Sequence, residues 1–149
     1  MRAVIQRVTR ATVEVEGNII ASINKGLCVL VGFTATDTEK DLQYICQKII
    51  GLRIFDDENA FMNLSIADVN GEILLVPQFT LYGDARKGRR PSYSLAMKPE
   101  EASQFFDTFV SLCKQQYPRV QQGKFQAYMQ VSITNDGPVT ILLDSSRLF

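Results

Sequence analysis

The sequence predicts a single α/β domain over residues 1–149, with three layers (β/β/α) in which two mostly β layers are covered by two main helices. Three observations lead to this fold class. Polar and apolar residues alternate toward both ends of the chain, which is typical of strands with one buried face. Two internal segments instead repeat apolar residues at helical spacing. A length of 149 residues suits one domain with one substantial core.

Strands are predicted for the first third of the chain. An interrupted apolar pattern runs from Val4 to Val8, and residues 12–16 alternate between polar and apolar side chains. Gly17-Asn18 predicts a turn, after which residues 19–23 return as a strand. Residues 27–31 are continuously apolar, which is typical of a strand that is buried on both faces.

A first helix is predicted after Thr36. Thr36 and Glu39 have the spacing of a capping box, in which the two side chains satisfy free N–H groups of the first helical turn. One apolar stripe follows at i, i+3, i+4, i+7 and i+8, formed by Leu42, Ile45, Cys46, Ile49 and Ile50. Residues 53–55 predict a short strand, and Asn70-Gly71 predicts a hairpin turn before a strand over residues 72–76.

A second helix is predicted from Pro99, a residue favoured at the first helical position, to the residue before Pro118. Its buried stripe comprises Ala102, Phe105, Phe106, Phe109, Leu112 and Cys113. Residues 125–134 then alternate like a strand, with one face formed by Phe125, Ala127, Met129, Val131 and Ile133. Asn135 to Pro138 predicts a turn, and residues 139–143 predict a final strand.

The composition excludes several classes of enzyme and binding protein. The chain has no histidine, so neither a Ser-His-Asp triad nor a histidine-ligated zinc site can form. Its 16 Lys and Arg residues balance 16 Asp and Glu residues, so any contact with nucleic acid needs a local basic patch. Three widely spaced cysteines predict buried thiols in a reducing compartment. Neither a signal sequence nor a membrane span is evident, so a soluble cytoplasmic protein is expected.

One candidate catalytic segment is Gln78-Phe79-Thr80, which follows the strand predicted over residues 72–76. Pro77 cannot donate to a sheet ladder, so it marks a sheet edge or a bulge. At such a point the backbone N–H groups of Gln78, Phe79 and Thr80 are free to bind an oxyanion. On the local sequence alone, an ordinary strand is the alternative.

A basic loop follows this segment. Four cations lie within five residues of a chain without net charge: Arg86, Lys87, Arg89 and Arg90. Gly88 and Pro91 keep the loop out of regular structure, and Arg side chains suit a phosphate backbone because they donate two hydrogen bonds at once. No aromatic residue is interleaved with the cations, so base stacking is not predicted here. A solvated loop is the alternative.

The predicted turn over residues 135–138 contains a Gly-Pro peptide bond. Bonds of the X-Pro type are cis in about 5–6% of cases in folded proteins, usually in tight turns. A turn between two strands is such a place, so Gly137-Pro138 is a candidate for a cis bond. The alternative is a plain hairpin connection.

Six segments in order resemble the D-aminoacyl-tRNA deacylases. They are residues 1–8 (MRAVIQRV), 52–55 (LRIF), 62–65 (MNLS), 78–84 (QFTLYGD), 86–91 (RKGRRP) and 135–140 (NDGPVT). Individual motifs are short, but six in the same order within 149 residues are specific. The resemblance extends over essentially the whole chain.

This resemblance implies an enzyme, a carboxylic ester hydrolase that cleaves the ester between a D-amino acid and the 3′ acceptor end of tRNA and that also removes misloaded glycine. It implies a cytoplasmic homodimer that uses no metal and no cofactor. In the family, a cis Gly-Pro enters the partner's active site and excludes L-aminoacyl esters, and this role carries over to Gly137 and Pro138. Arg7 matches the arginine that helps hold the motif.

The resemblance also implies roles for other residues. Gln78, Phe79 and Thr80 are expected to form the catalytic segment, and the basic loop is expected to bind tRNA. The pocket wall is expected to comprise Phe125, Ala127 and Met129.

Two mechanisms stay open. Thr80 matches a position proposed as a nucleophile, although no histidine can activate its hydroxyl. In the other mechanism, which we favour, backbone N–H groups around Phe79 and Thr80 polarise the ester carbonyl while the terminal 2′-hydroxyl of the tRNA positions a water.

Two positions depart from the family pattern. Pro77 replaces the usual serine, so no serine hydroxyl can be required there, and a related group that clears L-alanine from threonine tRNA also begins this motif with Pro-Gln. Gln126 stands where the family commonly has glycine, and two outcomes are open: the larger side chain reshapes the pocket wall near Phe125 and Met129, or it faces solvent. Two other functions remain open: an RNA-binding module without activity, and a hydrolase of small D-amino-acid esters or peptides.

Overall fold

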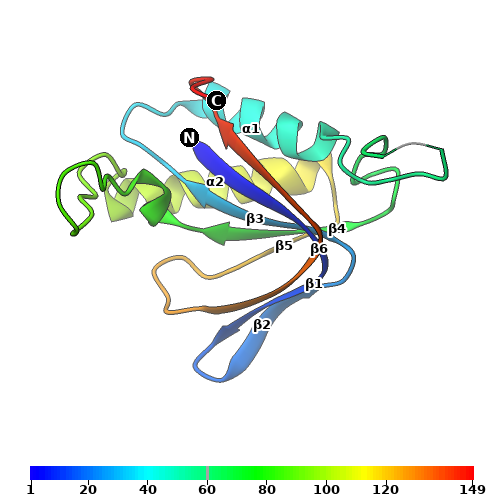
Figure 1. Ribbon diagram of the computed structural model, residues 1–149. Helices are drawn as coiled ribbons and strands as arrows, with labels where there is room; N and C mark the ends of the chain where they lie inside the picture. Colours follow the sequence, from blue (N-terminus) through cyan, green and yellow to red (C-terminus); the bar gives the residue numbers. More distant parts are fainter. Residues whose placement is uncertain (60) are drawn as a thin grey trace.

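The computed structural model describes residues 1–59 and 61–149. Its elements in chain order are β1 (Arg2–Val15), β2 (Asn18–Ile23), β3 (Gly26–Gly32), α1 (Glu39–Gly51), β4 (Glu72–Pro77), the 3-10 helix η1 (Phe79–Tyr82), α2 (Pro99–Gln116), β5 (Val120–Gln122) and β6 (Gln130–Asp144). The two α-helices lie on the same side of the sheet (Figure 1). Within the described residues, no helix has the length and hydropathy that a membrane span requires.

All six strands belong to one sheet, in the order β2-β1-β3-β4-β5, with β6 paired to β1. The long strand β1 is antiparallel to three partners: its first half pairs with β3, its second half with β2, and β6 follows it along both halves. This arrangement makes the sheet curve strongly (Figure 1). The predicted fold class is confirmed, and the two β layers are two halves of one continuous sheet instead of separate sheets.

The parallel part of the sheet places both helices. The pairs β3–β4 and β4–β5 are parallel, so each needs a crossover connection, and these contain α1 and α2. Residues of β4 alternate between two hydrophobic cores, with Ile73 and Leu75 packed toward the helices and Leu74 and Val76 in the second core. Burial on both faces explains why residues 73–76 of β4 are all apolar.

The cysteines are buried, as predicted, and none forms a disulfide. Cys46 and Cys113 belong to the stripes that α1 and α2 turn toward the sheet. Burial raises the pKa of the Cys28 thiol to about 12, so this side chain is a protonated, apolar part of the second core.

The start of α1 lies two residues later than predicted. Thr38, instead of Thr36, is the N-cap, and its backbone N–H donates to the carboxylate of Asp41, instead of Glu39, at 2.8 Å. The reason is that the preceding residues form a turn, in which the Thr34 N–H donates to Asp37 Oδ2 at 2.8 Å.

Three other local predictions were wrong. Asn70 has a positive φ of 50° and does form a turn, but β3 and β5, the described partners of β4, are both parallel to it, so no hairpin follows. Residues 53–55 form only an isolated bridge, between Phe55 and Leu64. The strand predicted over residues 125–134 begins only at Gln130.

Residues 135–138 were predicted as a turn between two strands, and they lie instead inside the single strand β6. Its register on β1 passes from Thr140 opposite Gln6 to Asn135 opposite Val8. Residues 136–139 of β6 therefore correspond to Arg7 alone on β1. We call this segment the β6 bulge. It keeps β6 continuous while turning Gly137 and Pro138 out to solvent.

A glycine at the start of β3 gives a direct test of the parallel pairing. A Cβ on Gly26 would lie 1.9 Å from the carbonyl oxygen of Glu72 on β4, so Gly26→Ala must force the two strands apart. We expect the free energy of unfolding to fall by about 1–3 kcal/mol, the usual cost of overpacking, in urea denaturation. Gly51→Ala is the control, because nothing lies within 4 Å of a Cβ there. Equal unfolding midpoints for the two variants would contradict the pairing.

Candidate active site

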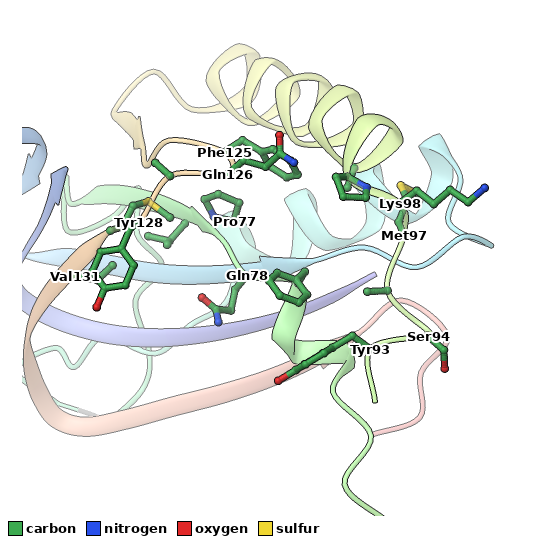
Figure 2. Close-up of a pocket in the computed structure, with 17 residues that line it drawn as sticks. Pro77, Gln78, Tyr93, Ser94, Met97, Lys98, Phe125, Gln126, Tyr128 and Val131 are labelled. Carbon is green, nitrogen blue, oxygen red and sulfur yellow. The ribbon is translucent and has the colours of Figure 1, made fainter. Parts of the chain in front are cut away.

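A cavity of about 680 Å³ opens where β4 ends, between the start of α2 and the segment that precedes β6. Figure 2 shows Phe125 and Tyr128 on one side of it and Tyr93 and Lys98 on the other, with Gln78 between them. The pocket is predominantly apolar, and its volume falls within the range of small-molecule sites.

Pro77 ends β4 at an open edge of the sheet, as the sequence predicted. Odd-numbered residues of β4 point their N–H groups toward β5, since the Ile73 N–H donates to the Arg119 carbonyl at 2.9 Å. The short strand β5 pairs with β4 only as far as Leu75. A proline at position 77 therefore forfeits no ladder hydrogen bond, and the chain is free to turn into η1.

The backbone around η1 supplies two unpaired donors instead of the three predicted. The Gln78 N–H donates to the Val31 carbonyl at 2.7 Å, so it is not free. The first bond of η1 runs from the Leu81 N–H to the Gln78 carbonyl at 3.3 Å. The N–H groups of Phe79 and Thr80 precede this bond and have no acceptor in the described part of the chain. They are the candidate oxyanion donors.

In the described part of the chain, no base is hydrogen-bonded to the Thr80 hydroxyl. Its oxygen accepts a hydrogen bond from the Gln78 side-chain amide, and the residue is exposed beside the pocket without lining it. Among the described residues that line the cavity there is no carboxylate, imidazole or thiol. A threonine hydroxyl in such surroundings is a weak nucleophile.

Phe125, Ala127 and Met129 all line the cavity, but from a turn and the irregular segment that follows it instead of from a strand. The Phe125 ring packs on Phe106 of α2, with the ring centroids 6.1 Å apart. Gln126 has a φ of 56°, a left-handed conformation that costs a residue with a Cβ roughly 1–2 kcal/mol. A glycine would adopt this conformation without that cost. Gln126 is exposed and also lines the pocket.

The Gly137-Pro138 bond is cis, and both residues are exposed. Neither lines the pocket of its own chain. Arg7 lies beneath the β6 bulge with only 7% of its surface exposed, and its Nε donates to the Asp136 carbonyl at 3.1 Å. Its Nη1 donates to the Ile54 carbonyl at 2.7 Å. The carboxylates of Asp56 and Asp136 each lie 3.4 Å from the Arg7 guanidinium and balance its buried charge.

The basic loop is exposed, and its base is closed by paired hydrogen bonds between Asp84 and Ser92, at 2.7 and 2.9 Å. Arg86 turns back to Asp84, with an N–O distance of 2.6 Å, and its hydrogen bonds lower the pKa of that carboxyl to about 2. For the other three cations, Lys87, Arg89 and Arg90, the described part of the chain offers no ion-pair partner. They are the charges available to a polyanion.

Several lining residues carried no prediction from the sequence, among them Tyr93, Met97 and Lys98. They lie between the basic loop and α2, where no periodic pattern marks a buried face. The exposed aromatic residue close after the cations was the available signal, and it became meaningful only when the fold placed Tyr93 beside Phe79.

Comparison with known proteins supports one family. Residues 4–144 match the family model described as D-Tyr-tRNA(Tyr) deacylase. The chain is 57% identical to the D-aminoacyl-tRNA deacylase of Thermosipho africanus (strain TCF52B) and 54% identical to that of Thermoanaerobacter sp. (strain X514), in both cases with 100% of each chain covered.

Two solved structures share the fold. The c-Myc DNA Unwinding Element Binding Protein is 46% identical and superimposes with a TM-score of 0.92, covering 97% of this chain and 98% of that one. The structure described as "a probable eukaryotic D-amino acid tRNA deacylase" is 17% identical, with a TM-score of 0.85 over 95% of this chain and 97% of its own. From the family model and the relatives, this chain belongs to the D-Tyr-tRNA(Tyr) deacylase family.

Proposed function

We propose that this chain hydrolyses the ester bond of D-aminoacyl-tRNA, releasing the D-amino acid and free tRNA, and that glycyl-tRNA is a second substrate. The observation that carries the proposal is the pairing of an apolar pocket with two unpaired backbone N–H groups, those of Phe79 and Thr80, at its edge. An ester carbonyl held at these donors becomes more electrophilic, because they stabilise the oxyanion that forms when water adds.

The water is positioned by the RNA in this proposal. No described side chain that lines the pocket is a carboxylate, imidazole or thiol, which leaves the Lys98 amine and the hydroxyls of Tyr93 and Tyr128 as its titratable groups. The 2′-hydroxyl of the terminal adenosine is adjacent to the ester and can orient the attacking water. One oxyanion donor is worth roughly 3–4 kcal/mol of barrier, which is substantial help for an ester that is already labile.

The proposed enzyme selects D substrates by excluding L-aminoacyl esters, in a homodimer whose subunits complete each other's active sites. Two features support this part of the proposal: Gly137 and Pro138 are exposed, and they do not line the pocket of their own chain. Placed in a partner's pocket, their carbonyls would clash with an L side chain and leave a D side chain free. Glycine has no side chain to reject, so it passes.

The experiment that tests the function follows ester loss from D-Tyr-tRNA, L-Tyr-tRNA and Gly-tRNA at equal concentrations. Hydrolysis of the D and glycyl esters with retention of the L ester is expected. Binding of all three without turnover would favour an RNA-binding module. Equal turnover of D-tyrosine methyl ester, which has no tRNA body, would favour a hydrolase of small esters.

Replacing Thr80 separates the two mechanisms. We expect Thr80→Ala to retain much of the single-turnover rate, because its backbone N–H remains and its hydroxyl has no base. D-Tyr-tRNA ending in 2′-deoxyadenosine should be a poor substrate of the unaltered enzyme. Rapid turnover of the deoxy substrate, combined with an inactive Thr80→Ala variant, would support the nucleophile mechanism instead.

Crowding the β6 bulge should weaken chiral selection. A Cβ on Gly137 would lie 3.0 Å from both Arg7 Nη2 and Val139 Cγ2, at a φ of 120° that L residues rarely adopt. Gly137→Ala should therefore displace the Gly-Pro carbonyls and raise kcat/KM for L-Tyr-tRNA relative to D-Tyr-tRNA. Gly17→Ala is the matched control, because its φ is also positive, at 79°, but nothing lies within 4 Å. A fixed ratio in Gly137→Ala would place the selectivity filter elsewhere.

Removing charge from the basic loop should weaken tRNA binding more than chemistry. We expect the double variant Arg89→Ala, Arg90→Ala to raise KM for D-Tyr-tRNA and to flatten its dependence on salt, because fewer counterions are released on binding. Initial rates between 50 and 200 mM salt would measure both effects. The control is the double variant Lys40→Ala, Lys48→Ala, which removes the same charge from α1. If it changes KM and the salt dependence equally, the basic loop is a solvated loop without a specific role in tRNA binding.

A further inference from the structure

We propose that Tyr93 is a stacking platform for the nucleobase that precedes the terminal adenosine of the bound RNA. The inference rests on the proposed function, because it names a further subsite of the same substrate. The sequence showed no aromatic residue among the cations of the basic loop, and the fold supplies one at the base of that loop.

The Tyr93 ring is held in place, and part of it faces solvent. It meets the Phe79 ring edge to face, with centroids 5.1 Å apart and an interplanar angle of 67°. It also packs closely on Gly83, where an added Cβ would lie 3.1 Å from Tyr93 Cε1. Yet 41% of the residue remains exposed. A ring fixed on two sides and open elsewhere can stack on a base with little loss of side-chain entropy.

Tyr93 lies between the basic loop and the pocket, which are the two places that the 3′ end of the RNA would contact. The hydrogen bonds between Asp84 and Ser92 hold the basic loop directly beside it in the chain, and Lys87, Arg89 and Arg90 present their charge from that loop. On its other side Tyr93 lines the pocket that would receive the aminoacyl ester (Figure 2). An RNA strand running from cations to pocket therefore passes this ring.

Single-stranded nucleic acid is commonly bound by this combination of a basic track and an aromatic face. The cations follow the backbone, and the ring stacks on a base regardless of its identity. The 3′ end of tRNA is unpaired, so its bases are free to stack on protein. The structure thus favours a single-stranded RNA end over a duplex as the occupant of this surface.

The test compares two oligoribonucleotides that carry no amino acid. One ends in CCA, and the other is identical except that its penultimate nucleotide is abasic. Binding of each is measured by fluorescence anisotropy. Tyr93→Ala should weaken binding of the intact end about tenfold, the usual scale for loss of one stacked base. The abasic end should bind about as weakly to the unaltered protein, and Tyr93→Ala should weaken it little further. Tyr93→Phe should bind like the unaltered protein. Leu95→Ala, which removes an exposed apolar side chain two residues away, is the control.

Two results would overturn the inference. One is equal weakening of the intact and abasic ends by Tyr93→Ala, which would mean that Tyr93 only braces Phe79. The other is unchanged affinity for the intact end. Because this RNA carries no amino acid, neither result depends on deacylation. Failure of the proposed function would be seen separately, in the ester-loss assay on the unaltered protein. In that assay, Tyr93→Ala should lower kcat/KM more for D-Tyr-tRNA than for D-tyrosyl-adenosine.

Discussion

The β6 bulge depends on the hydrogen bonds of the buried Arg7 guanidinium. Arg7 is a single residue of β1 that faces four residues of β6. Its side chain donates hydrogen bonds to the backbone carbonyls of Asp136 and Ile54. A buried charge is costly unless it is paired and hydrogen-bonded, and two carboxylates at 3.4 Å meet that need. The same interactions tie β1, the bulge and the segment after α1 together. Gly137 and Pro138 are thereby presented to solvent from a braced backbone.

The topology of the sheet explains why such a site needs so few reactive side chains. The parallel strand β4 ends where its neighbour β5 has already stopped, so the chain can leave the sheet at Pro77 and turn into η1 with two N–H groups unpaired. We infer that the backbone performs both polarisation at η1 and exclusion at the β6 bulge, while side chains shape the pocket. A chain without histidine can support this chemistry, because neither task requires a proton-transferring side chain.

The sequence predicted what local periodicity controls. The stripe of α1 and the apolar runs of β3 and β4 lie where expected. Features set by distant contacts were missed: the cap moved to Thr38 because Asp37 is engaged by Thr34 and by the amino group of Met1. Residues 135–138 carry every local signal of a turn, and only pairing with β1 makes them a bulge. The position of Tyr93 close after the cations was a weak signal, and it gained meaning only when the fold brought Tyr93 beside Phe79.

In the dimer that we propose, the Gly-Pro carbonyls of one subunit filter substrates at the pocket of the other, and a heterodimer can isolate this effect. One subunit would carry Gly137→Ala with an intact pocket, and its partner would carry Phe125→Glu to disable its pocket while keeping an intact β6 bulge. The only working pocket then faces the intact filter. We expect this heterodimer to hydrolyse D-Tyr-tRNA and still to reject L-Tyr-tRNA. Hydrolysis of L-Tyr-tRNA at the level of the Gly137→Ala homodimer would show instead that each filter serves the pocket of its own chain.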